Sequence, residues 1–505
     1  MQFHWKVLAW MVAGVLVGLV LQTAFEAPAW SGAALTDGPS GVTVSRSSGP
    51  AARAGLTDGD VLTEVIVRRG RPEQTTVQLA SPADWAAVLA AAENGDTLWL
   101  RKASDPAAIP LTVEMDPSSS RARWIEPFAF SADIFLSLLK LLIVPLVMSS
   151  ITTGVAGVGG MGDLRRLGGK TFVYYMSTSL LAILVGQVLV NVIRPGEGAQ
   201  LGLTPDAAAG DRNENFVEIL RRMVPDNIFE AMTSNGAMLQ IIFFSLLLGW
   251  AITRTPEPHG KRIGDLVDAF FRVMMSMAEG ILLLLPYGVF ALLVKVVAGT
   301  GFGVFKPLLV YMVTVALALV LHCCVTLPLV LRFVARISPI GWLKAMAPAL
   351  MTAFSTSSSS MTLPVTMRTV EQRGKVSNRV ASFTLPLGAT INMDGTALYE
   401  CIGVIFLAQY YAGQPGGEAL TLTAQAMVVL LALLASIGSA GIPSAGLVMM
   451  LTILSALGLP LEGAALLLAV DRPLDMLRTV TNVWSDSCGA AVIARSEGEL
   501  GPAEL

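Results

Sequence analysis

Long apolar segments recur along most of the chain. The first runs from Val7 to Phe25, and seven more lie at residues 128–155, 169–194, 226–254, 265–298, 303–336, 379–412 and 460–495. A helix that crosses a bilayer needs about 20 predominantly apolar residues. The pattern therefore predicts an all-α polytopic membrane protein with eight transmembrane helices.

Two further apolar segments, at residues 341–366 and 424–453, are broken near the middle. Serines fill residues 357–360 of the first, and a run of glycine, serine and proline fills residues 436–446 of the second. Non-helical backbone at membrane depth survives only where it is buried in protein or lines a wet cavity. We therefore expect two re-entrant helical hairpins, which in transporters mark a substrate site near the bilayer midplane. A patch of small residues for helix packing is the alternative for the serines.

Residues 31–122 differ from the rest, because short runs of alternating apolar and polar residues are separated there by turn residues. Strands are expected at 41–44, 60–65, 97–100 and 109–113, and a helix is expected to start at Pro82. The run from Ser48 to Leu62, Ser-Gly-Pro-Ala-Ala-Arg-Ala-Gly-Leu-Thr-Asp-Gly-Asp-Val-Leu, resembles a stretch of bacterial PDZ domains. We expect a small α/β PDZ-like domain between transmembrane helices 1 and 2, and an unrelated small α/β insertion is the alternative.

Composition supports a membrane protein. Apolar residues make up 53% of the chain and charged residues 14%, whereas soluble domains carry about 25% charged residues. The mean hydropathy is +0.64. Basic residues cluster in the short connections near residues 165–170, 254–262, 332–344 and 368–379, which the positive-inside rule places in the cytoplasm.

The first apolar run decides the expected orientation. It follows Lys6 and is longer than the apolar part of an ordinary signal peptide, so we expect a retained helix that leaves the cytoplasm. Both termini would then be cytoplasmic, the PDZ-like domain extracytoplasmic, and the protein a multi-pass component of the plasma (inner) membrane. A cleaved signal peptide is the alternative.

The last apolar segment contains a stripe of polar residues. At about 100° per residue, Asp471, Asp475, Arg478, Asn482 and Asp486 fall within about 80° of one another on a helix. Each unpaired charge at the bilayer centre costs roughly 2.5–3.5 kcal/mol, so four charged groups would oppose insertion by about 10 kcal/mol unless they face protein, water or ions. The stripe therefore indicates a site.

A second polar run interrupts the apolar segment 379–412. Asp394 lies there beside the amide of Asn392 and the hydroxyl of Thr396, and Gly395 is expected to let the helix unwind. Carboxylate, amide and hydroxyl oxygens are the hard ligands that alkali cations need. This run predicts a cation site.

Four motifs in order now support a family resemblance: the serine run, Asn-Met-Asp-Gly-Thr at 392–396, Ser-Ile-Gly with Ile-Pro-Ser-Ala-Gly in the second broken segment, and the final stripe. Together they resemble the dicarboxylate/amino acid:cation symporters, the glutamate transporter family, over residues 1–30 and 123–497. Thr-Ala-Leu-Tyr-Glu at 396–400 is similar to the excitatory amino acid transporters.

The resemblance implies a secondary active symporter, not an enzyme, that imports aspartate or glutamate with sodium ions by alternating access. It also implies a homotrimer that binds a small acidic amino acid and no nucleic acid. The expected divisions are the first transmembrane helix (1–30), the PDZ-like domain (31–122), helices 2–6 (123–336), the site region of hairpin 1, helix 7, hairpin 2 and helix 8 (337–497), and a C-terminal tail (498–505).

The resemblance further implies site residues. Asp475 would bind the substrate ammonium, Arg478 its side-chain carboxylate, and Thr479 with Asn482 its main-chain carboxylate. The implied substrate-binding residues are Ser358, Ser359, Ser360, Thr396, Gly441, Asp475, Arg478, Thr479 and Asn482. The implied sodium ligands are Tyr175, Thr178, Ser179, Thr390, Asn392, Asp394, Ser436, Ile437, Asn482 and Asp486.

Glu400 is the candidate proton carrier, and a buried structural acid is the alternative. Many family members carry another arginine just before the hairpin serines or just after the ammonium-binding aspartate. This chain has Ser357 and Met476 there, while Arg472 is more like the dicarboxylate branch.

Three other functions remain as alternatives: a C4-dicarboxylate:cation symporter, an anion channel, and an intramembrane protease with a PDZ domain. The protease alternative lacks a His-Glu-x-x-His zinc motif. His4, His259 and His322 have no ligand spacing and are expected to be incidental.

Overall fold

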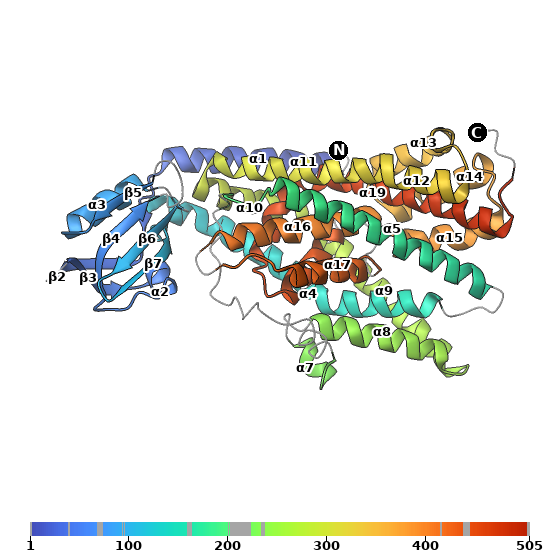
Figure 1. The fold of residues 1–505 in the computed structure, drawn as a ribbon, viewed down its shortest axis with the longest axis horizontal. Coiled ribbons are helices and arrows are strands. Elements are labelled where there is room, and N and C mark those ends of the chain that lie inside the picture. Colours follow the sequence, from blue (N-terminus) through green and yellow to red (C-terminus); the bar gives the residue numbers. More distant parts are fainter. Residues whose placement is uncertain are drawn as a thin grey trace.

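The computed structural model describes residues 3–38, 41–67, 74–92, 94, 96–158, 164–199, 201, 224–233, 238–414, 417–437 and 445–501. These residues form a body of long helices with a smaller α/β lobe at one end (Figure 1). The lobe lies opposite the end of the body that contains α14 (Ser359–Gln372).

The lobe contains a mostly antiparallel sheet and two short helices. Its elements are β1 (Ala29–Trp30), β2 (Ala33–Gly38), β3 (Gly41–Ser47), α2 (Gly49–Arg53), β4 (Val61–Val67), β5 (Thr75–Gln78), α3 (Pro82–Ala91), β6 (Thr97–Lys102), β7 (Asp105–Thr112) and β8 (Glu114–Met115). The strand order is β2-β3-β4-β6-β7, and β5 pairs with β4.

Alternation explains strands β3 and β6, whose buried positions face one core. Val42 and Val44 of β3 pack there with Leu98 and Leu100 of β6. The strands expected at 41–44, 60–65, 97–100 and 109–113 are present, and α3 begins at Pro82 as predicted. The Ser81 N–H donates to the Asp84 carboxylate over 2.8 Å, which caps the helix.

Two features join the lobe to the helical body. Its two connections pair with each other as the short ribbon β1–β8. Beyond β8, α4 (Ser120–Val158) begins, and Arg121 in its first turn donates to the carbonyl oxygens of Gln22 and Phe25 at 2.7 and 2.8 Å. These bonds fix the end of α1 (Phe3–Ala24) to the start of α4.

The helices that precede the site region in the sequence form the first part of the body and contact one another. They are α1, α4, α5 (Leu164–Ile193), α7 (Ile228–Met232), α8 (Met238–Arg254), α9 (His259–Leu282), α10 (Leu285–Thr300) and α11 (Phe305–Leu321). Helix α11 continues through a π-helical turn (His322–Thr326), α12 (Leu327–Val330) and a second π-helical turn (Leu331–Ala335).

Four helices in the described ranges are long and apolar enough to cross a membrane: Ser120–Ala156, Arg166–Ile193, Phe305–Ala335 and Asn378–Ala412. The pair α9 and α10, bent by 53°, is a fifth candidate. The prediction of a largely helical polytopic membrane protein is therefore confirmed. The segment expected as one span at 265–298 is two helices, because Leu283 and Leu284 separate α9 from α10.

The site region is built from broken helices. It contains α13 (Pro339–Thr356) with α14, α15 (Asn378–Ile391) with α16 (Asp394–Ala412), α17 (Leu422–Ile437) with α18 (Ala445–Ala456), and the long helix α19 (Glu462–Glu497). The first pair breaks at Ser357, whose φ of 51° lies in the left-handed region, and Ser358 caps α14. The loop between α17 and α18, residues 438–444, lies outside the described residues.

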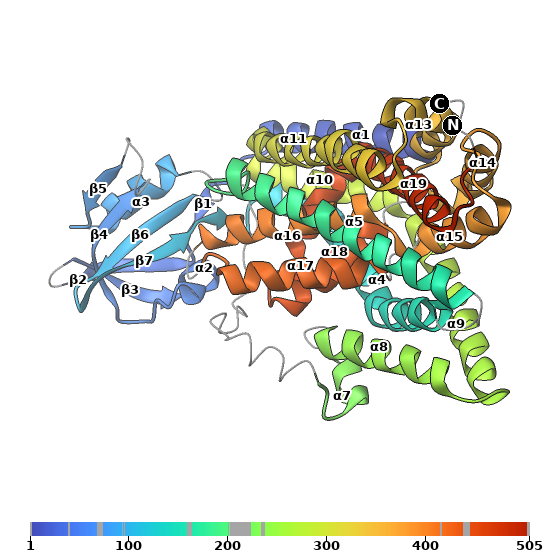
Figure 2. The ribbon, with the colours of Figure 1, turned by 45° about the vertical axis from the view of Figure 1, so that its right-hand side comes forward.

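Helix α16 is the centre of this region. Every residue from Asp394 to Ala408 is buried, which is the pattern of a helix surrounded on all sides. It contacts α5, α11, α17, α18 and α19. Figure 2 shows α16 and α17 side by side next to α5.

Candidate functional site

Asp394 lies at the meeting point of four elements and is fully buried. Ser179 of α5 and Ser485 of α19 each donate a hydroxyl hydrogen bond to its carboxylate, both at 2.6 Å. His322, in the π-helical turn after α11, approaches the same carboxylate with Nε2 at 3.1 Å. Asp394 is thus surrounded by polar groups from three other helices.

The helix break that presents Asp394 is at Asn392 and Met393, where α15 ends and α16 begins. Asp394 is in the first turn of α16, where free N–H groups and the helix dipole favour a negative charge. The expectation that the helix unwinds at Gly395 is wrong, because Gly395 is helical. Its N–H donates to Asn482 Oδ1 at 2.8 Å, and a Cβ there would lie 2.7 Å from the Arg478 carbonyl oxygen. Gly395 therefore allows α19 to pack closely.

A second carboxylate joins the same network. Asn392 donates to Asp486 Oδ1 at 2.9 Å and to the Ser485 hydroxyl at 3.0 Å. Thr178 reaches the oxygens of both Asn392 and Asp394 at 3.4 Å. Six of the predicted sodium ligands therefore lie in one cluster: Tyr175, Thr178, Ser179, Asn392, Asp394 and Asp486.

Gly388 of α15 makes this cluster possible. A Cβ at Gly388 would lie 2.6 Å from the Tyr175 hydroxyl and would collide with the Asp486 carboxylate. Without a Cβ at Gly388, the Tyr175 hydroxyl has room to donate to the Thr384 carbonyl oxygen at 2.8 Å. The backbone of α15 thus closes one side of the cation cluster.

Two of the other four predicted cation ligands direct their hydroxyls to carbonyl groups of their own helices. The Thr390 side chain is exposed, and its hydroxyl bonds to the Leu387 carbonyl of its own helix at 3.0 Å. The Ser436 hydroxyl bonds to the Leu433 carbonyl at 2.8 Å, and Ile437 ends α17. A role of Thr390 or Ser436 as a cation ligand would therefore use the backbone.

The stripe on α19 contains a cluster of buried ion pairs. Arg478 Nη2 lies 2.7 Å from Asp475 Oδ1 and 3.0 Å from Asp471 Oδ1. Arg472 Nη1 lies 3.1 Å from Asp475 Oδ2. The Arg478 guanidinium also stacks over the Tyr399 ring, 3.9 Å from its centroid, as cations do on aromatic faces.

The remaining predicted substrate residues surround this cluster. Asn482 Nδ2 lies 3.3 Å from the Thr396 hydroxyl, and the Thr479 hydroxyl donates to the Asp475 carbonyl at 2.8 Å. Ser358 and Ser359 are buried at the break of the first hairpin, whose helices both pack against α19. Ser360 is exposed, and Gly441 lies outside the described residues.

Glu400, the candidate proton carrier, follows Asp394 on α16 and is fully buried. Neither carboxyl oxygen has a hydrogen-bond partner among the groups that the structure describes. A buried carboxyl without a partner is costly when ionised, so the position favours a neutral, protonated group.

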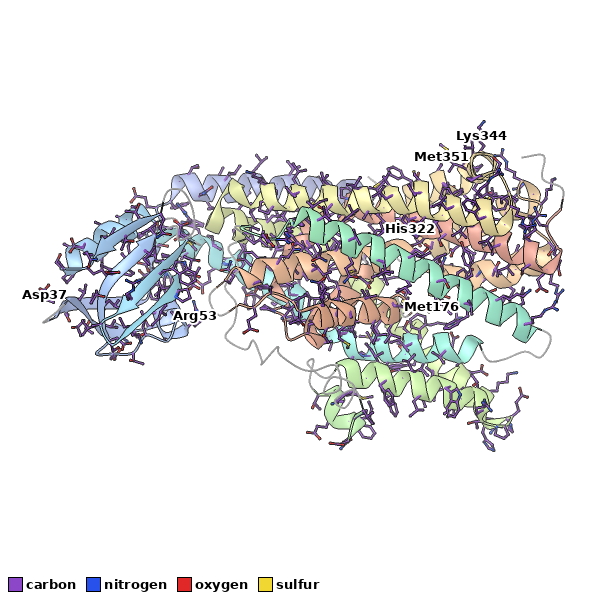
Figure 3. The ribbon with its side chains drawn as sticks, in the orientation of Figure 1. Asp37, Arg53, Met176, His322, Lys344 and Met351 are labelled. Atoms are coloured by element: carbon purple, nitrogen blue, oxygen red, sulfur yellow. The ribbon has the colours of Figure 1, made fainter. Side chains whose placement is uncertain are left out.

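His322 is the residue that sequence reasoning missed. It was expected to be incidental, but its side chain is fully buried with Nε2 beside the Asp394 carboxylate. Figure 3 shows it within the helical body, far from Asp37 and Arg53 in the lobe. An ionisable side chain inside an apolar span is a functional candidate by default, and that signal could have identified it.

Most of the chain is similar in sequence to known transporters. Residues 115–496 match the sodium:dicarboxylate symporter family, a match that begins at the last strand of the lobe. Excitatory amino acid transporter 3 of Homo sapiens is 35% identical over 430 residues, which cover 74% of this chain and 80% of that protein. Excitatory amino acid transporter 1 of Ambystoma tigrinum is 34% identical over 446 residues, covering 76% and 80%. The putative sodium-dependent excitatory amino acid transporter glt-4 of Caenorhabditis elegans is 35% identical over 434 residues, covering 75% and 85%.

Proposed function

The chain belongs to the sodium:dicarboxylate symporter family, and from that premise we propose that it imports aspartate or glutamate together with sodium ions. The family consists of secondary transporters, and the chain is not an enzyme. The observation on which the proposal rests is that two buried polar clusters, one rich in oxygen ligands and one of ion pairs, share α19.

The oxygen-rich cluster supports sodium as the coupling ion. Asp394 and Asp486 supply full negative charges, and Thr178, Ser179 and Asn392 supply neutral oxygens around them. Hard cations prefer such oxygens. Sodium bound there would neutralise two carboxylates that are otherwise expensive to keep ionised in a membrane.

The ion-pair cluster supports an acidic amino acid as the substrate. A guanidinium fork suits bidentate binding of the distal carboxylate, and a fixed carboxylate suits an ammonium. Arg478 holds Asp475 through Nη2 over 2.7 Å, while its Nε and Nη1 have no hydrogen-bond partner among the described residues and could receive the distal carboxylate. A C4-dicarboxylate has no ammonium for Asp475, which makes it the less favoured substrate.

Uptake into proteoliposomes tests this function. Labelled aspartate, glutamate and succinate are offered under separate sodium, proton and potassium gradients. We expect a sodium gradient to drive accumulation of aspartate or glutamate but not of succinate. Accumulation of succinate at a similar rate would favour the dicarboxylate function, and current without accumulation would favour a channel. Asp475→Ser is the matched variant, which should weaken amino acid uptake more than any residual succinate uptake.

Eight transmembrane helices with two re-entrant hairpins, cytoplasmic termini and a homotrimer complete the proposal. The helix pairs α13 with α14 and α17 with α18 support the hairpins. Lys344, near the start of α13, lies at the end of the body opposite Asp37 of the lobe (Figure 3), which supports an extracytoplasmic lobe. Impermeant maleimide should label a cysteine placed at Asp37 in intact cells, but not one placed at Lys344.

The lobe is proposed to be a PDZ-like domain that binds an extended peptide. Strand β2 is at the edge of the sheet and lies next to α3, so a peptide could add a strand there. Deleting about residues 35–115 should leave transport in place. Loss of uptake by trimers that still assemble would instead make the lobe part of the transport cycle.

A further inference from the structure

Asp475 binds two guanidinium groups, one on each carboxylate oxygen. Arg478 lies 2.7 Å from Oδ1 and Arg472 lies 3.1 Å from Oδ2. The proposed function gives Asp475 the task of binding the substrate ammonium. In the structure, both oxygens that would receive that ammonium already face a positive charge.

The two arginines are held very differently. The Arg478 side chain is 1% exposed, pairs with Asp471 as well as Asp475, and stacks on Tyr399. Gly446 of α18 also approaches it closely, since a Cβ there would lie 2.7 Å from Arg478 Nη1. The Arg472 side chain is 10% exposed and lies nearer the start of α19. Arg472 is therefore the guanidinium that can leave.

Repulsion between like charges explains why one of the two guanidinium groups has to leave Asp475 when the ammonium binds. Asp471, Arg472, Asp475 and Arg478 together carry no net charge. An ammonium that reached Asp475 while Arg472 stayed would be a third cation on one carboxylate and would repel the guanidinium. If Arg472 moves away, the ammonium replaces its positive charge at Oδ2, and Asp475 keeps a cationic partner on each oxygen.

We infer that Arg472 is an internal competitor of the substrate amino group, an inference that rests on the proposed function. In the empty protein Arg472 neutralises Asp475, and on binding the ammonium displaces it. The pair of Arg472 and Asp475 also allows the substrate-free protein to return across the bilayer. A buried carboxylate without a partner would oppose that movement. Return of the empty wild-type protein would then need no other cation at Asp475.

The variant Arg472→Met, similar in volume but uncharged, tests the inference. Without the competitor, we expect aspartate to bind about tenfold more tightly, the effect of about 1.4 kcal/mol. Net uptake should fall relative to exchange of internal for external aspartate, because only net uptake requires the empty carrier to return. Arg472→Lys keeps the charge and should restore net uptake. Arg272→Met is the matched control, because Arg272 is 77% exposed on α9 and pairs with Asp268.

Two further measurements make the outcome independent of how well Arg472→Met folds. Guanidinium ion added to Arg472→Ala should restore net uptake, which a merely structural loss would not allow. Wild-type net uptake should proceed without potassium inside the vesicles. The inference is overturned if Arg472→Met binds aspartate no more tightly and keeps its ratio of net uptake to exchange, or if wild-type net uptake requires potassium. A wrong proposed function would give a different result from a wrong inference. In that case the wild-type protein itself would accumulate no aspartate.

Discussion

The lobe and the site region place their charged residues in opposite ways. In the lobe, Asp60 pairs with Lys102 over 2.7 Å and Glu64 with Arg101 over 2.6 Å, and all four side chains keep some exposure to solvent. In the site region, the carboxylates Asp394, Glu400, Asp471, Asp475 and Asp486 are no more than 6% exposed.

This difference separates charges kept for stability from charges kept for function. An exposed ion pair contributes about 0–1 kcal/mol to stability. A buried pair often costs more in desolvation than it gains, so its retention indicates a role other than holding the fold. Changes in the site region should therefore affect transport strongly, and changes in the lobe should affect local stability weakly.

The largest effect is expected for Asp394→Asn. The amide removes the negative charge at the centre of the cation cluster, and its NH2 group replaces the oxygen that accepts either the Ser179 or the Ser485 hydroxyl. Loss of one partner in such a desolvated set costs about 2–5 kcal/mol, so sodium-dependent aspartate binding should fall by at least 30-fold.

Sodium titration of aspartate binding measures this effect. Asp133→Asn is the matched control, because Asp133 forms a surface pair with Lys295 and its side chain is 60% exposed. The control should keep wild-type sodium dependence. Equal sodium dependence in Asp394→Asn would remove Asp394 from the coupling site.

Arg478→Thr should abolish aspartate and glutamate uptake and shift preference to small neutral amino acids. The variant removes the guanidinium that would bind the distal carboxylate and leaves Asp475 for an ammonium. Competition by alanine and serine against labelled aspartate measures the shift. Arg272→Thr, on an exposed face, should leave selectivity unchanged. Selectivity for aspartate that survives in Arg478→Thr would contradict the assignment.

The difference between the lobe and the site region also explains which of their features could be predicted from the sequence. In the lobe, alternation at Val42 and Val44 predicts a strand directly, because one face is buried and the other is solvated. In α19, the helical period groups Asp471, Asp475 and Arg478 on one face, and the structure pairs them.

The missed features depend on contacts between distant segments. At the break between α15 and α16, the Gly395 N–H donates to Asn482 of α19, a contact between residues 87 apart in the sequence. Nothing near His322 in the sequence indicates Asp394, which lies 72 residues away. The pair of Arg472 and Asp475 is different, because the two residues are three apart on one helix and the sequence could have predicted their contact.

Glu400→Gln should have a narrower effect than the first two changes. Glutamine imitates the protonated acid, so the site keeps its shape but can no longer release a proton. Net uptake should lose its pH dependence, while exchange of internal for external aspartate should continue. Glu371→Gln, in an exposed hydrogen bond with Asn378, is the control. An unchanged pH profile in Glu400→Gln would return Glu400 to a structural role.

The smallest effect is expected in the lobe, at Asp60. Burial raises the pKa of Asp60, but the hydrogen bonds from Lys102 and Thr57 outweigh it and hold the pKa below its usual value. A carboxyl whose pKa is lowered by folding stabilises the fold above its unfolded pKa, about 3.9, and loses that contribution as the pH falls through the folded value.

Asp60→Asn should therefore destabilise the lobe by about 1 kcal/mol at pH 7 and by progressively less below about pH 4. Faster hydrogen exchange of the β4 and β6 amides in the full chain measures the loss, and Lys102→Met completes a double-mutant cycle for the pair. Aspartate uptake should not change, because the pair lies in the lobe and touches none of the buried clusters. If uptake falls along with lobe stability, the lobe is energetically coupled to the site, and the division between stabilising and functional charges does not hold for this protein.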